Sequence, residues 1–308
     1  MLKIGLHFAT LPAESHPMSH VILDNEPLVR LIGFIGIFVG MALLERLAPA
    51  RQLSRRGRRW LTNLGLSATA RVVVYLFVQF VLPVAGVGIA FWAQDRNIGL
   101  FNSISITPAL AFVISFFALD GLIYGQHVVF HRFEILWRMH KVHHADPDLD
   151  VTTAVRFHPL EILISLFIKA AAILALGVPP LAVIAFEVLL NGTAMFNHAN
   201  LKLGATANRI LSLFIVTPDM HRVHHATDYD AQNLNFGFNL SLWDRVFGTY
   251  RHADKAELST MPVGLDEYAT DDKKLKPTEF IWSLILPFVT THSPTENKPD
   301  KGMNESGK

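Results

Sequence analysis

Long apolar runs alternate with short polar connections along the first two thirds of the chain. The runs cover 28–47, 69–92, 108–126, 160–177 and 180–197. A helix needs about 20 residues, with a lower limit of about 17, to cross the hydrocarbon of a bilayer. The first three runs are therefore predicted to span the membrane, and the last two, which meet around Pro179, to form a short helical hairpin. The pattern predicts an all-α integral membrane bundle with four to five membrane helices.

Composition supports this class and removes several others. Hydrophobic residues make up 51% of the 308 residues and charged residues 17%, with a mean hydropathy of +0.32, which is too apolar for an ordinary soluble domain. A net charge of +1 without a basic patch gives no reason to expect nucleic acid as a partner. The chain has no cysteine, so any metal must be held by histidine, carboxylate, amide or water.

Basic residues in the short connections predict the orientation. The stretch 51–60 holds five arginines, whereas 94–107 holds only Arg96. Because cytoplasmic loops are enriched in Lys and Arg, residues 51–65 are predicted to be cytoplasmic and 94–107 external. The following run then returns to the cytoplasmic side, and the hairpin goes up and back. We expect a bacterial inner membrane protein, with the endoplasmic reticulum as the alternative.

This orientation divides the chain into five segments. We expect an external segment at 1–27, membrane helices at 28–126, a catalytic region at 127–252 that includes the 160–197 hairpin, and a cytosolic segment at 253–292. Residues 293–308 are polar and are expected to be a disordered tail. The apolar piece 279–290 is too brief to span, so it is expected to pack on the core or lie at the membrane interface.

Charged residues inside the apolar runs should be paired, because an isolated charge in hydrocarbon is costly. Lys169 and Glu187 lie at matching depth on the two arms of the hairpin. We expect them to form an ion pair. A second pair, Arg71 with Asp120, is expected near the inner face.

Histidines form three tight clusters, one HxxxH and two HxxHH. Residues three and four apart share one face of a helix, so each cluster presents a stripe of imidazoles. Imidazole is the commonest metal ligand, and these stripes predict a metal site. The clustered residues are His127, His131, His140, His143, His144, His221, His224 and His225.

Two further histidines extend this set. His198 at the inner end of the last arm is a natural ninth ligand, and His158 is a candidate tenth. A single tetrahedral zinc would need only three or four donors, so the excess indicates two ions. The isolated His252 and those nearer the two ends are expected to be structural.

The order HxxxH, HxxHH, hairpin, HxxHH, with DMHRVHHATD followed by NLNFGFNLSLWDRVFGTY, resembles the fatty acid hydroxylase and sterol desaturase superfamily of integral membrane di-iron oxygenases. The similarity covers roughly 118–252. The HxxxH first box is more like the sterol C5-desaturase, C4-methyl sterol oxidase and alkylglycerol monooxygenase types. The family's ligand positions map onto the eight clustered histidines and His198, and less securely onto His158.

The resemblance implies a membrane stalk under a cytosolic helical cap, with two Fe ions between them that activate O2 to hydroxylate or desaturate a lipid C–H bond. Zn is expected to replace iron in some purified samples. The chain has no HPGG motif and no cysteine. Electrons are therefore expected from a separate cytochrome b5-like protein or ferredoxin with an NAD(P)H reductase. Asn191, Asn235 and Asp244 are candidates to support the ligands or close the cap, with helix capping and turn formation as the alternative.

Two other function classes remain open at this point. A His-rich metal transporter would hold its ligands near the bilayer midplane, whereas these clusters are expected at the inner helix ends. A zinc hydrolase would need few ligands, an open zinc and a general base, and the chain has no HExxH motif. The lipid substrate is left open among sterol, fatty acyl, ether lipid, hopanoid and carotenoid.

Overall fold

The computed structural model describes residues 17–53, 56–80, 86–268 and 276–289. Over these ranges the regular structure is helical apart from three isolated β-bridges, which confirms the all-α prediction. The first half of the chain holds α1 (Pro17–Asp24), α2 (Glu26–Leu47), α3 (Arg56–Phe80), α4 (Val87–Asp95), α5 (Leu100–Ser103), α6 (Pro108–Arg132) and α7 (Glu134–His144). The second half holds α8 (Pro159–Leu176), α9 (Pro180–Asn197), α10 (Ala205–Leu211), α11 (Pro218–His224), α12 (Tyr229–Gln232), α13 (Leu242–Val246), α14 (Lys255–Thr260) and α15 (Phe280–Ile285), with short 3-10 turns at Thr153–Val155, Asp266–Tyr268, Lys276–Thr278 and Leu286–Phe288.

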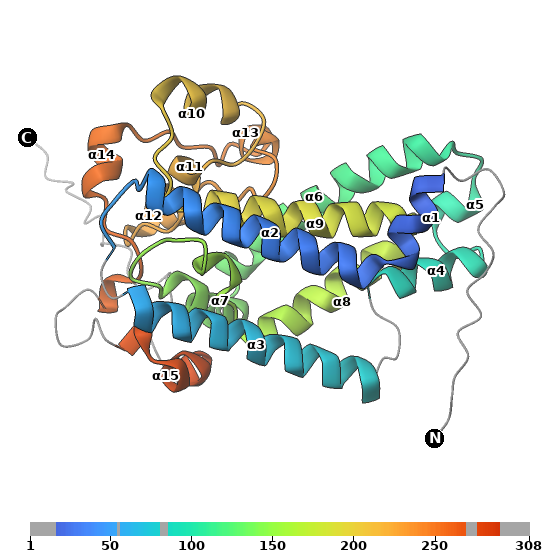
Figure 1. Ribbon diagram of the computed structural model, residues 1–308, viewed down its shortest axis with the longest axis horizontal. Helices are drawn as coiled ribbons and strands as arrows, with labels where there is room; N and C mark the ends of the chain where they lie inside the picture. Colours follow the sequence, from blue (N-terminus) through green and yellow to red (C-terminus); the bar gives the residue numbers. More distant parts are fainter. Residues whose placement is uncertain (1–16, 54–55, 81–85, 269–275, 290–308) are drawn as a thin grey trace, which may run out of the picture.

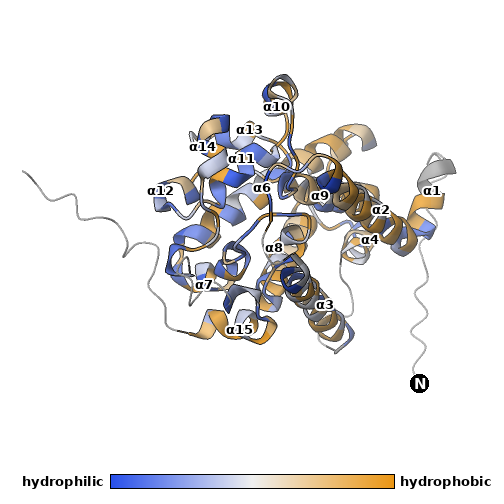
Figure 2. Ribbon diagram, turned by 60° about the vertical axis from the view of Figure 1, so that its left-hand side comes forward, coloured by the Kyte–Doolittle hydropathy of each residue, from blue (hydrophilic) through white to orange (hydrophobic). Residues whose placement is uncertain are grey.

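Five of these helices are long and apolar enough to cross a membrane: α2, α3, α6, α8 and α9. Their outward faces carry large exposed apolar side chains, such as Ile32 and Val39 of α2, which is what a lipid-facing helix requires. Figure 2 shows the apolar colour along α2, α3 and α9, and more polar colour over α7 and α11 to α14. The protein is therefore an integral membrane protein.

The membrane helices pack as two pairs around a central helix. α2 packs on α9, α3 packs on α8, and α6 contacts both arms of the α8–α9 hairpin. Buried apolar residues of α4, α6, α8 and α9, among them Leu119, Ile173 and Phe186, form the core between them. The α8–α9 hairpin is therefore packed against three other membrane helices, α2, α3 and α6.

Two glycines allow the chain to cover the hairpin turn. Gly177 ends α8 with a φ of 66°, and Gly99, with a φ of 98°, lies against it just before α5. A Cβ added at Gly99 would lie 2.2 Å from the backbone nitrogen of Gly177. Only glycine allows this approach and this left-handed backbone at both positions.

The predicted membrane run at 69–92 is wrong in its bounds. The spanning helix is α3, which begins at Arg56 and ends at Phe80, and α4 is a separate short helix from Val87. Hydropathy misplaced the start because Arg59 is inside the helix and fully buried, with its charge paired to Asp146 and Asp150. Arg56, Arg58 and Arg59 of the arginine-rich stretch therefore lie in α3, whereas Arg51 precedes the helix.

One of the two expected membrane ion pairs is confirmed. Nζ of Lys169 lies 3.1 Å from a carboxylate oxygen of Glu187, and Arg30 of α2 pairs with the same carboxylate. The Arg71–Asp120 pair is wrong. The guanidinium of Arg71 lies over the ring of Phe34, and Asp120 accepts hydrogen bonds from the Trp243 indole at 2.8 Å and the Leu240 amide at 3.3 Å. The hydrogen bond from Trp243 of α13 to Asp120 thus links the cap to α6.

Helices α10 to α14 form a cap at one end of the bundle, beyond the ends of α2, α6 and α9 (Figure 1). α15 lies beside α3, and the 3-10 turn Leu286–Phe288 that follows it lies beside α7, where Leu286 packs with Leu66 and Val142. The apolar piece at 279–289 therefore packs on the core, as expected for a segment too short to span. The predicted tail at 293–308 and most of the predicted N-terminal segment lie outside the described residues.

Candidate metal centre

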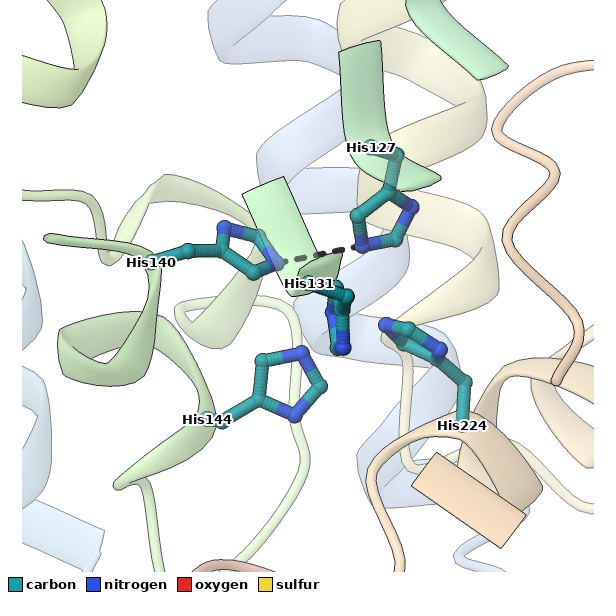
Figure 3. A group of neighbouring side chains, drawn as sticks. All are labelled: His127, His131, His140, His144 and His224. Carbon is teal, nitrogen blue, oxygen red and sulfur yellow. Dashed lines mark hydrogen bonds between the residues drawn. The ribbon is translucent and has the colours of Figure 1, made fainter. Parts of the chain in front are cut away.

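Nine buried histidines meet where the membrane helices end and the cap begins. The five-histidine group holds one nitrogen from each of His127, His131, His140, His144 and His224, all within 4.8 Å of one another. The four-histidine group does the same with His143, His198, His221 and His225. Figure 3 shows the five rings of the first group converging from α6, α7 and α11. These nine are the eight clustered histidines and His198 predicted from the sequence, whereas the candidate tenth ligand, His158, is not among them.

Helical spacing divides each HxxHH box between the two groups. His140 and His144 are four apart on α7 and face the five-histidine group, while His143 faces the other. On α11 the division is reversed: His221 and His225 go to the four-histidine group and His224 to the five-histidine group. Each box therefore contributes to both groups, and a change in either helix moves ligands of both.

Local signals place these short helices. α11 begins with Pro218 after Thr217, whose side chain accepts a hydrogen bond from the amide of Met220 at 3.4 Å. α8 begins with Pro159, and α9 ends so that His198 is its C-cap residue. Proline in the first turn and a capping hydroxyl are typical of fixed helix starts.

The ring nitrogens have the spacing that shared metal coordination requires. Nε2 of His198 lies 3.0 Å from Nε2 of both His143 and His221, and Nε2 of His127 lies 3.1 Å from Nε2 of His140. Two metal–nitrogen bonds of about 2.1 Å at a right angle would separate their nitrogens by about 3.0 Å. These residues fit a pair of metal ions.

Several buried ring nitrogens of these histidines have no hydrogen-bond partner in the part of the chain described. They are Nε2 of His131, His144, His224 and His225, and Nδ1 of His221 and His225. An unpaired buried polar atom is costly, and a metal ion would satisfy such lone pairs. This is an independent indication that the clusters are metal sites.

Backbone carbonyls hold the opposite ring nitrogens. Nδ1 of His127 donates to the Phe236 carbonyl at 2.8 Å, Nδ1 of His224 to Leu234 at 2.9 Å and Nδ1 of His198 to Ala194 at 2.7 Å. Because a carbonyl only accepts, each Nδ1 carries the proton and each Nε2 keeps its lone pair. This fixes both the tautomer and the ring orientation.

Glu161 in the first turn of α8 is a site residue that the sequence did not reveal. Its Oε1 accepts a hydrogen bond from Nδ1 of His140 at 2.7 Å, and both side chains are buried. Glu161 therefore holds Nδ1 of His140 in the same way that backbone carbonyls hold Nδ1 of His127, His198 and His224. Its only sequence signal is its place two residues after Pro159, in the turn that follows His158.

Burial sets the charge of the histidines outside the membrane helices. It lowers the pKa of His140 to about 3 and that of His198 to about 4. Burial, followed by repulsion from neighbouring imidazoles, also lowers the pKa of His143, His144, His221 and His225 well below the ordinary value. These rings are neutral at pH 7, the form that binds metals.

The four less secure candidates lie outside both groups. His158 caps α8: its Nδ1 accepts from the Leu160 amide and its Nε2 faces the Leu284 carbonyl, both at 3.2 Å. Asn191 is exposed and donates to the carbonyl of Glu187, one turn earlier, at 2.7 Å. For these two residues the geometry is that of helix capping and local helix bonding.

Asn235 and Asp244 organise the loop that supports the site. Asn235, with a φ of 53°, donates to the carbonyls of Met220 and Arg251 at 3.0 and 2.9 Å, which ties α11 to the 251 segment. Asp244 accepts from the amides of Phe236 and Gly237 at 2.7 and 2.9 Å. Since the Phe236 carbonyl holds His127, Asp244 positions that histidine at one remove.

A buried ionic network holds the turn after α7. Arg59 of α3 donates to Asp146 at 2.6 Å and to Asp150 at 2.9 Å, and Arg156 donates to Asn63 at 2.7 Å. Burial alone would raise the pKa of Asp146, but the neighbouring guanidinium of Arg59 outweighs it, and the pKa falls below its usual value. The Arg156 carbonyl lies 3.2 Å from Nδ1 of His143, so this network fixes the second box on the bundle.

A cavity of about 590 Å³ runs from this site into the membrane bundle. His127, His140 and Glu161 line one end, and its wall continues over apolar side chains such as Phe130 and Leu166. At its other end lie Arg71 and Lys169. A long apolar molecule could therefore reach the histidines from within the membrane.

Comparison with known proteins agrees with this geometry. The family model for fatty acid hydroxylases matches residues 112–249, which include all nine histidines. The ornithine lipid hydroxylase of Rhizobium tropici is 29% identical over 51% of this chain and 44% of its own length. The human alkylglycerol monooxygenase is 32% identical over 50% of this chain and 34% of its own length. The chain thus spans less than half the length of these two relatives.

A third relative covers more of the fold. The rat cholesterol 25-hydroxylase is 23% identical over 71% of this chain and 74% of its own length. No solved structure gives a significant match. The histidine order, the helical membrane bundle and these matches lead to one conclusion: residues 112–249 form a fatty acid hydroxylase domain.

Proposed function

We propose that the protein is an integral membrane oxidoreductase that uses O2 to hydroxylate or desaturate a C–H bond of a membrane lipid. The observation that carries the proposal is the convergence of nine buried imidazoles in groups of five and four, two of which, His127 and His140, line one end of a cavity inside the membrane bundle. Names of the relatives support the same class, since they are lipid hydroxylases or monooxygenases.

Two iron ions would be held by these groups, one by each. His127, His131, His140, His144 and His224 would hold the first, and His143, His198, His221 and His225 the second. Bound iron would supply O2 activation, with zinc able to take its place in a purified sample because imidazole sites accept several divalent ions. A shell of neutral ligands adds no negative charge to the ions.

The chain's own residues orient the ligands and exclude water. The ring of Phe157 stacks on His143 with centroids 4.5 Å apart, and Phe236 lies 5.1 Å from His131. Carbonyls and Glu161 keep the donor nitrogens aimed inward. The lipid chain would lie along the cavity and bring one carbon to the histidines, so position along the cavity would select the carbon that reacts.

The proposal also includes the source of electrons and the side of the membrane on which the site lies. A separate cytochrome b5-like protein or ferredoxin, with an NAD(P)H reductase, would deliver electrons. The arginine-rich start of α3 favours a cytoplasmic site. A bacterial inner membrane is the proposed location, with the endoplasmic reticulum as the alternative.

The test is turnover of lipid by purified protein in nanodiscs, loaded with ferrous iron and given O2 and a reductase system. We expect a lipid product with one added oxygen or one added double bond, absent without O2. His143→Ala and His224→Ala should abolish both iron binding and turnover. His252→Ala, at an exposed histidine outside both groups, should leave them unchanged. Full turnover in either ligand variant, or O2-independent hydrolysis or ion transport, would refute the proposal.

A further inference from the structure

The membrane end of the cavity carries more positive than negative charge. Arg30 of α2, Arg71 of α3 and Lys169 of α8 line it, with Glu187 of α9 as the carboxylate among them. Glu187 pairs with both Lys169 and Arg30, and Glu26 pairs with Arg30 from one turn earlier. Three cations against two carboxylates leave one positive charge over.

That charge is Arg71. Its guanidinium lies 4.8 Å from the centroid of the Phe34 ring, and the described part of the chain places no carboxylate within ion-pairing distance of it. Arg71 lies well inside the apolar span of α3, at 57–79. An ionisable side chain within a membrane segment is costly unless it faces a partner or serves a ligand.

Arg71 is also accessible from the membrane. Arg71 and Tyr75, one turn later, both line the cavity and both have exposed side chains. This end of the cavity lies between α2, which packs on α9, and α3, which packs on α8. A lipid can therefore enter laterally and meet the guanidinium before it meets the histidines.

We propose that Arg71 is a binding subsite for the anionic group of an acyl lipid, a carboxylate or a phosphate, in the part of the cavity that Lys169 also lines. Polar neighbours extend this subsite along the wall: Gln126 donates to the Ser165 hydroxyl at 2.6 Å, and both line the cavity between Lys169 and the histidines. The apolar chain of the lipid then occupies the remaining length of the cavity.

Helix geometry gives the distance from the charged residues at the membrane end of the cavity to the metal site. Lys169 lies eight residues after Glu161 on α8, and Glu187 eleven residues before His198 on α9. At a rise of about 1.5 Å per residue these separations are about 12 and about 16 Å. Resting on the proposed function, this places the oxidised carbon far along the chain from the acidic group, and not on the carbon beside it.

Binding can be measured without turnover. Spin-labelled stearic acid and its methyl ester are compared in nanodiscs by the immobilised fraction in electron paramagnetic resonance, at a pH that keeps the acid ionised. Spin-labelled phosphatidic acid against spin-labelled diacylglycerol, which lacks the phosphate, tests the phosphate source in the same way. We expect wild type to prefer at least one acidic probe over its matched control by about tenfold, the effect of one charged hydrogen bond.

Arg71→Gln should abolish this preference and Arg71→Lys should keep it. Arg96→Gln is the matched control, because Arg96 also stacks on an aromatic ring, Trp92 at 4.7 Å, but does not line the cavity. If Arg71→Gln does not fold, competition on wild type decides: palmitate should displace the spin-labelled acid and hexadecanol should not.

Equal binding of each acidic probe and its control, or Arg71→Gln behaving like Arg96→Gln, would overturn the subsite. This outcome is separable from failure of the proposed function. Acid binding that depends on Arg71 in a protein without O2-dependent turnover would support the subsite and refute the proposed oxygenase. O2-dependent turnover of acids and esters alike would support the oxygenase and refute the subsite.

Discussion

Nδ1 of His140 lies 2.7 Å from Oε1 of Glu161, and this hydrogen bond joins the second histidine box to the first turn of a membrane helix. The pair fixes the His140 ring with its Nε2 toward His127. Glu161 also lines the cavity, so the residue that orients a ligand is part of the wall that a lipid would touch. In the proposed function, this one carboxylate would link metal binding to lipid binding.

Glu161→Gln should weaken metal binding by the five-histidine group. The amide is neutral and a weaker acceptor, so the His140 ring loses both orientation and basicity, and losses of about 10–100-fold in affinity are typical of such changes. Iron retention during titration with a chelator measures this. Glu134→Gln, at an exposed position in the first turn of α7, is the control. Equal retention in the two variants would show that Glu161 does not support the site.

Arg59→Leu should destabilise the whole protein. It leaves the buried carboxylates of Asp146 and Asp150 without their cation, a change that costs about 3–5 kcal/mol in comparable buried pairs. Thermal unfolding in detergent gives the comparison. Arg58→Leu removes only an exposed pair with Glu279 at 3.5 Å and should shift the melting temperature little. Similar melting temperatures for the two variants would contradict the role of the network.

Gly237→Ala should impair the loop that holds His127. A Cβ there would lie 2.6 Å from Oδ2 of Asp244 and 2.9 Å from the Leu240 carbonyl, so Asp244 must move away from the Phe236 amide. We expect reduced iron binding and a lower melting temperature. Gly125→Ala on α6 meets no atom within 4 Å and should be neutral or slightly stabilising. An equally neutral Gly237→Ala would disprove the crowding argument.

Glu187→Gln should destabilise more than Lys169→Gln. Removing the carboxylate charge leaves both Lys169 and Arg30 without it inside the membrane bundle, whereas Lys169→Gln leaves Glu187 paired with Arg30. Melting temperatures in nanodiscs test the order. The reverse order, or equal losses, would show that the two cations do not share this carboxylate.

The histidine site could be located from the sequence because its pattern is local. Ligands three and four apart on one helix appear directly as HxxxH and HxxHH, and only their convergence needed the fold. How each HxxHH box is divided between the two groups also follows from helical spacing. The Lys169–Glu187 pair could also be predicted, because residues at equal distances in sequence from the hairpin turn lie at the same depth on its two arms.

The supporting residues could not be found in this way. Glu161 is a lone carboxylate 21 residues from His140, and no periodicity connects the two. Arg59 was expected in a loop because hydropathy does not register that Asp146 and Asp150, about 90 residues later, neutralise it inside the bundle. The pairing of Arg71 with Asp120 was predicted from their depth in the membrane alone. In the structure Arg71 contacts the Phe34 ring and Asp120 accepts a hydrogen bond from Trp243.

Iron stoichiometry tests the central claim most directly. Protein loaded anaerobically with saturating ferrous iron, freed of unbound metal and measured by mass spectrometry of the intact chain should hold two ions, one for each histidine group. His143→Ala and His224→Ala should each lose this loading, because each removes a ligand from an HxxHH box that serves both groups. A wild-type protein that saturates at one ion, or full loading in both variants, would contradict the account.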